Sequence, residues 1–100
     1  MVKIKGVKVN NKNKENCKKI LSHFGDKSQL LKTVEEATEL SLSVQHFIAK
    51  KALYSDVVTE IADVIIMCEQ MKTVFGAGLI EFEVDRKISR TIKLIEGLNE

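Results

Sequence analysis

VVTEIADVIIMCEQMKTVF, residues 57–75, decides the fold, because it is a long apolar run without glycine or proline. Its apolar side chains occupy nearly the whole circumference of a helix, and only Glu60, Asp63 and Glu69 add negative charge. The segment therefore predicts a long α-helix that is the most buried of the chain.

Two helices are expected before this segment. Residues 14–24 repeat apolar side chains at helical spacing, and Gly25 supplies a C-terminal cap. Asp26 and Gln29 have the spacing of a capping box, which predicts a second helix from Asp26 to about Ala52. The stripe of this helix that we expect to share a face comprises Leu30, Val34, Ala37, Leu40, Val44 and Ile48.

A fourth helix is expected at the C-terminal end. Residues 53–56 predict a short connection before the central segment, with Ser55 or Asp56 as the N-cap. The sequence Gly-Ala-Gly at 76–78 breaks the central helix, and helical periodicity resumes over residues 79–96. The inner stripe expected there is Ile80, Val84, Ile88, Ile92 and Ile95. The predicted fold class is all-α, with four helices.

Charge is distributed unevenly along the chain. The net charge is +2, but residues 1–32 carry +7 and residues 33–69 carry −5. Within the basic part, residues 1–13 predict a short strand or a loose arm. A basic arm suggests nucleic acid, yet no recognition motif accompanies it, so a solvated lysine-rich surface is favoured and no nucleic-acid partner is expected.

The cysteines and the hydropathy of the sequence indicate the cellular compartment that we expect. Cys17 and Cys68 lack the spacing of a metal or redox motif, so we expect reduced, buried thiols. The N-terminus lacks the apolar run of a signal peptide, and no stretch approaches the roughly 18 apolar residues that a membrane span needs. We expect one cytoplasmic domain, residues 1–100, without membrane association.

Two acidic pairs are the strongest functional signal. Glu36 and Glu39 are three residues apart, and at about 100 degrees per residue their side chains lie on one helix face. Glu60 and Asp63 repeat this spacing inside the apolar central segment, whereas Glu35 points further outward. One such pair is common on solvated helix surfaces, but two pairs on adjacent helices are harder to explain as surface charge.

Metal binding explains the two pairs. Burying ionised carboxylates without partners costs several kcal/mol each, so four of them on inward faces call for positive charge. Carboxylates are hard oxygen ligands that suit Mg²⁺, with Mn²⁺ as a substitute, and such sites commonly include substrate phosphates. His23 and His46 lack the Glu-x-x-His spacing of helical di-iron proteins, which argues against oxygen chemistry.

The motif EEATEL at 35–40, followed by EIAD at 60–63, resembles the EExxE…ExxD signature of MazG-like all-α nucleotide pyrophosphohydrolases. The resemblance extends from about residue 17 to residue 97. It implies that Glu36, Glu39, Glu60 and Asp63 hold Mg²⁺, and that the reaction converts a nucleoside triphosphate to the monophosphate and pyrophosphate. It also implies a helical bundle completed as a homo-oligomer, a dimer or a tetramer, which agrees with the large apolar surface predicted here.

Other residues are candidates for substrate contacts. One of the metal ligands or Glu35 could accept the proton of the attacking water. Lys87 and Arg90, in KISRT, could bind phosphate or form a solvated pair, and this segment lacks an Asn that the better-known family members have. Lys32 could neutralise Glu36, which is favoured, or bind phosphate. Phe24 and Gln29 are weaker candidates for contacting a base.

Two other classes of protein remain as alternatives. A non-catalytic helical module could keep the fold and bind nucleotide or a partner, but it would have no reason to retain four buried carboxylates. A helical metal carrier would normally include His among its ligands.

Overall fold

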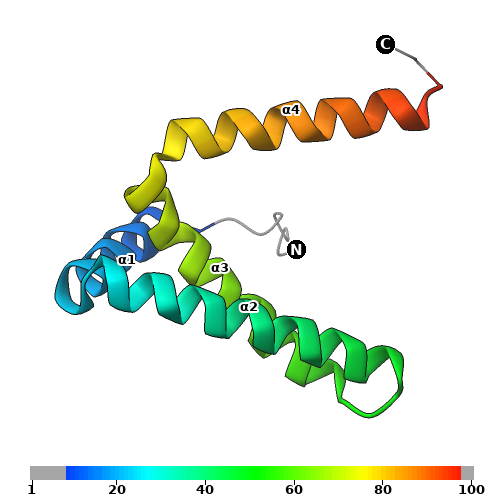
Figure 1. Ribbon diagram of the computed structural model, residues 1–100, viewed down its shortest axis with the longest axis horizontal. Helices are drawn as coiled ribbons and strands as arrows, with labels where there is room; N and C mark the ends of the chain where they lie inside the picture. The colour runs from blue at the N-terminus through cyan, green and yellow to red at the C-terminus, as the bar shows by residue number, and fades with distance from the viewer. Residues whose placement is uncertain (1–8, 98–100) are drawn as a thin grey trace, which may run out of the picture.

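The computed structural model describes residues 9–97, which form four α-helices (Figure 1). The helices are α1 (Asn11–Phe24), α2 (Asp26–Ile48), α3 (Tyr54–Phe75) and α4 (Ala77–Ile95). No strand occurs within residues 9–97, and the predicted all-α class is confirmed. In this same part of the chain, no helix combines the length and apolar character needed to cross a membrane.

Helix α1 begins earlier than predicted. The Asn10 side chain caps it, because its Oδ1 accepts a hydrogen bond from the Asn13 backbone N–H at 2.8 Å. Residues 11–13 are therefore helical, and the strand or loose arm predicted for residues 1–13 is wrong for them, while residues 1–8 lie outside the described part. At the other end, Gly25 has φ 90° and donates its N–H to the Leu21 carbonyl at 2.8 Å, as its predicted capping role requires.

The start and end of α2 differ from the prediction. Gly25 occupies the N-cap position without any side-chain hydrogen bond, so the capping box expected from Asp26 and Gln29 is wrong. Gln29 is instead buried inside the protein. The helix ends at Ile48 rather than near residue 52, because Lys50 turns the backbone with φ 61°.

Helix α3 begins at Tyr54, and the predicted N-caps Ser55 and Asp56 lie inside its first turn. The Asp56 carboxylate nevertheless caps the start of the helix, because it accepts a hydrogen bond from the Leu53 backbone N–H at 2.9 Å. At the far end only Gly76 of the predicted break is non-helical, with φ 104°, and α4 follows at once.

Helices α2 and α3 form an antiparallel hairpin across the connection 49–53, and they lie side by side along most of their length (Figure 1). Helix α1 packs against both of them at the end opposite to this connection. Helix α4 contacts α3 alone and extends away from the hairpin. The radius of gyration of 16.3 Å, against about 13 Å for a compact domain of this length, reflects that extension.

The apolar core is small and lies where α1 crosses α3. Its buried apolar members are Cys17, Leu21, Met67 and Met71. Cys68 is exposed, so the prediction of two buried thiols holds only for Cys17.

The apolar stripes predicted for α2 and α4 do not face this core. Within α2 only Leu40 of the predicted stripe is half-buried, and within α4 only Ile80 is, whereas the other members are exposed. Helix α2 turns a different, largely polar face toward α3. With α4 extended, the described chain has no further helix to cover the apolar faces.

Candidate metal centre

The inward face of α2 is a polar stripe. Its members are separated by alternating steps of four and three residues, which place them on one side of the helix. They are Gln29, Thr33, Glu36, Leu40 and Ser43, all buried or half-buried. A helix face with this composition cannot pack through apolar contacts alone, so its polar atoms need hydrogen-bond partners on α3 or from a ligand.

Three carboxylates meet between α2 and α3. Glu36 is 5% exposed, Glu60 and Asp63 are half-buried, and one carboxylate oxygen from each lies within 4.8 Å of the others. The Oε2 atoms of Glu36 and Glu60 are buried and have no hydrogen-bond partner. Converging hard oxygen ligands with unused lone pairs are the donor set that Mg²⁺ prefers, so these residues fit the predicted ion.

Glu35 and Glu39 extend this acidic cluster toward the surface. With Glu36 they form a second group whose oxygen atoms also lie within 4.8 Å of one another, and both side chains are exposed, so the inward placement expected for Glu39 is wrong. The charge of Glu39 raises the pKa of Glu36 and of Glu60, so its carboxylate is near the groups on both helices. Glu36 therefore belongs to both groups and occupies the centre of the cluster.

Lys32 compensates part of this negative charge. Its ammonium nitrogen lies 3.4 Å from Glu35 Oε1 and 3.5 Å from Glu36 Oε1, and its side chain is 48% exposed. These two carboxylates, Glu35 first, raise the pKa of Lys32 above its ordinary value. The neutralising role favoured from the sequence matches this ion pair, but one lysine cannot balance the whole cluster.

The electrostatic cost is visible in two of the carboxyl groups. Burial raises the pKa of Glu36, and the charges of Glu39 and Asp63 raise it further, against the lowering effect of Lys32. Burial also raises the pKa of Glu60, followed by the charges of Glu39, Asp63 and Glu36. The folded chain thus opposes ionisation here unless positive charge is added.

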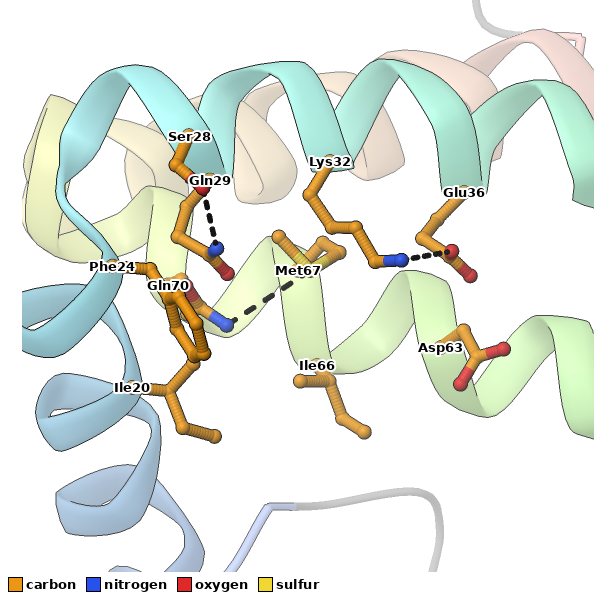
Figure 2. A pocket seen from close by; sticks show the side chains of 10 residues that line it. All are labelled: Ile20, Phe24, Ser28, Gln29, Lys32, Glu36, Asp63, Ile66, Met67 and Gln70. Atoms are coloured by element: carbon orange, nitrogen blue, oxygen red, sulfur yellow. Dashed lines mark hydrogen bonds and ion pairs between the residues drawn. The ribbon is translucent and has the colours of Figure 1, made fainter.

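A groove of about 530 Å³ leads from the cluster toward α1. Figure 2 shows Glu36 and Asp63 at one end of it and Phe24, Gln29 and Gln70 at the other, with Lys32 between them. The remaining lining residues are Ile20, Ser28, Ile66 and Met67. Both residues suggested for base contacts, Phe24 and Gln29, therefore line the same groove as the acids.

Gln70 was not recognised in the sequence. It is the most deeply buried polar residue described, 1% exposed, and its Oε1 has no partner, a situation that costs about 1–3 kcal/mol. A signal was available, because Asp63, Met67 and Gln70 have the four- and three-residue spacing of one helix face. This signal was missed because Gln70 is uncharged and lies between methionines in an apolar segment.

Lys87 and Arg90 do not join this site within one chain. Both are exposed on α4, which contacts α3 only and does not touch α2. The expectation that they brace phosphates beside the acids is therefore not met by the single chain. One ion pair on that helix joins Arg86 to Glu83 at 2.8 Å.

No protein-family model, curated protein or solved structure matches the chain. The assignment of the site therefore depends on its own geometry and on the motif described above.

The metal-free protein should gain stability as the pH falls from 7 toward 5. Glu36 and Glu60 bind protons more readily in the folded chain than in the unfolded chain, where their pKa is near 4.5. This contribution is fully present below that value and is lost as the pH rises through the raised pKa. Urea unfolding in EDTA measures it, and Glu36→Gln should show a smaller increase. Identical pH profiles for the two proteins would contradict this assignment.

Proposed function

We propose that the chain is a Mg²⁺-dependent, MazG-like nucleotide pyrophosphohydrolase that converts a nucleoside or deoxynucleoside triphosphate to the monophosphate and pyrophosphate. The observation that carries the proposal is the meeting of Glu36, Glu60 and Asp63, of which Glu36 and Asp63 line one end of a groove, while buried oxygens of Glu36 and Glu60 lack partners. The reaction itself is taken from the resemblance to the EExxE…ExxD signature.

The groove suits a nucleotide in size and in polarity. Its volume lies within the range of about 300–1,000 Å³ that small-molecule sites occupy. The acidic end suits phosphates that arrive with a cation, whereas the end near Phe24 offers apolar walls and two amides. A molecule with an anionic tail and a flat, partly polar ring matches both ends.

Each side chain has a role in this proposal. Glu36, Glu39, Glu60 and Asp63 hold Mg²⁺, for which Mn²⁺ can substitute; when bound, such an ion polarises phosphate oxygens and makes a coordinated water more acidic. Glu35 is exposed beside the cluster and can accept the proton of the attacking water. Lys32 is close enough to the cluster to turn from its carboxylate partners toward a phosphate.

The uncovered apolar faces support a homo-oligomer, either a dimer or a tetramer. The accessible surface is 8311 Å², against about 5,700 Å² for a compact monomer of this mass. The large apolar side chains at least 60% exposed on α2 and α4 are Leu31, Val34, Ile48, Leu79, Phe82, Leu94 and Ile95. Surfaces of this kind are normally buried against a partner, and a second copy is the commonest one.

Assembly also bears on the phosphate contacts. Because α4 extends away from its own groove, Lys87 and Arg90 can brace phosphates only in the groove of another copy.

The alternative, a non-catalytic nucleotide-binding or interaction module, is favoured by the same exposed apolar faces. It does not account for the three carboxylates that converge between α2 and α3.

Glu60→Gln and Asp63→Asn should each lower kcat by at least tenfold, about 1.4 kcal/mol of barrier, because each removes a ligand charge. Pyrophosphate release from a panel of triphosphates in Mg²⁺ measures the effect. The exposed Glu15→Gln on α1 is the matched control and should keep full activity. Both variants retaining more than a tenth of the wild-type rate would rule out this site.

Millimolar Mg²⁺ or Mn²⁺ should raise the Tm by several degrees, because an ion bound only by the folded state stabilises it and relieves carboxylate repulsion. Thermal unfolding followed by circular dichroism measures the shift. Glu36→Ala should reduce the shift, whereas Glu15→Gln should preserve it. A wild-type melting curve insensitive to both metals, with and without a non-hydrolysable triphosphate, would refute the metal assignment.

The protein should form oligomers whose sites combine two chains. Light scattering after size exclusion should give a multiple of 11.3 kDa. Glu60→Gln and the double variant Lys87→Ala/Arg90→Ala should each be inactive alone. Mixing them should restore about a quarter of wild-type activity, because half of randomly exchanged dimers are hybrids with one complete site.

Two results would contradict this arrangement. A mass of 11.3 kDa at micromolar concentration would show that one chain is self-sufficient. A mixture no more active than its components would show that α4 does not act on another copy.

A further inference from the structure

Two buried carboxamides lie at the end of the groove that the metal chemistry does not use. Gln29 on α2 is 6% exposed and Gln70 on α3 is 1% exposed. Figure 2 shows their side chains approaching one another from the two helices, next to the ring of Phe24. Polar groups this deeply buried ordinarily have hydrogen-bond partners, so any of their atoms that lacks one indicates which kind of hydrogen-bonding group a ligand would supply.

The partners of Gln70 determine which of its atoms is available. Its Nε2 lies 3.9 Å from the Met67 Sδ, and a thioether has no proton to give, so the amino group faces the sulfur as donor. The carbonyl Oε1 is then left without a partner. No hydrogen bond joins this oxygen to the nearby Gln29 amide, and the side chains of Ile20, Phe24 and Met67, which line the same end of the groove, offer no donor.

The amide of Gln29 is partly engaged. Its Nε2 uses one of its two N–H groups to donate to the Ser28 Oγ at 3.4 Å, in the first turn of α2 beside the groove. A flat ligand that enters from the acidic end would therefore meet one unpaired acceptor on α3 and a positioned amide on α2. The unpaired acceptor calls for a ligand with an N–H group.

We propose that Gln70 sets the base preference of this site by accepting a hydrogen bond from an exocyclic amino group, so that cytosine and adenine nucleotides bind more tightly than uracil and thymine nucleotides. This inference rests on the proposed function. An amino group projects beyond the ring and carries two N–H donors, and glutamine pairs with the amino edge of adenine in other settings. A uracil oxygen in the same place would face the Gln70 oxygen, and a site left with an unpaired buried group rejects such a ligand.

The test compares the α,β-methylene analogues of dCTP and dUTP: cytosine carries an amino group at position 4 and an acceptor at N3, whereas uracil carries a carbonyl at position 4 and an N–H at N3. Isothermal titration calorimetry in Mg²⁺ should show wild-type protein binding the dCTP analogue at least about tenfold more tightly. Gln70→Met, which replaces the amide by an apolar chain of similar length, should bring the two Kd values within about threefold by weakening the dCTP analogue. Gln70→Leu serves the same comparison if the first variant folds poorly.

A matched control and a stability measurement separate recognition from packing. Gln45 is exposed on α2 outside the groove and donates to Ser41, so Gln45→Met should leave the binding ratio unchanged. Without ligand, Gln70→Met should have a Tm at least as high as wild type, because the unpaired oxygen is gone. A lower Tm together with an unchanged ratio would show that Gln70 is only a structural residue.

The outcomes distinguish this inference from the function on which it rests. Equal wild-type Kd values, or tighter binding of the dUTP analogue, would overturn the base preference, even if Mg²⁺-dependent hydrolysis is observed. The expected ratio in a protein that neither requires Mg²⁺ nor hydrolyses triphosphates would support base recognition and refute the enzyme. Absence of binding by both analogues, with and without Mg²⁺, would count against both proposals.

Discussion

Repulsion among carboxylates between α2 and α3 is the constraint on which the rest of the structure depends. Glu36, Glu60 and Asp63 are held close together by a helical hairpin, and Lys32 balances only part of their charge. An apolar interface would hold the same two helices with less opposition. The chain thus gives up stability at its most extensive contact between helices, as proteins commonly do at a binding site.

This constraint also explains why sequence patterns succeeded for the helices and misled about their faces. Glycines at 25 and 76 and the helical periodicity predicted four helices, and the i, i+3 spacing predicted both acidic pairs. Amphipathicity assumes that the apolar stripe turns inward, yet α2 turns its polar stripe toward α3. Because a single sequence cannot say which of two faces a neighbour covers, Leu30 and Val34 were assigned to the wrong side.

Other discrepancies have local causes. The turn after Ile48 has no glycine to mark it, since Lys50 itself adopts a positive φ, so the end of α2 was placed too late. Gln70 was overlooked because hydropathy averages hide one amide among methionines. Neither the groove nor the separation of α4 from the acids could follow from periodicity, because both depend on the angles at Gly25 and Gly76.

The connection 49–53 has a consequence for the order of folding. Closing so short a loop costs little chain entropy, and contacts between helices adjacent in sequence form quickly. The α2–α3 hairpin is therefore expected to form early in folding. Its acidic side chains would repel one another as soon as the hairpin forms, and the divalent cation proposed above, once bound, would stabilise this first native contact as well as the finished fold.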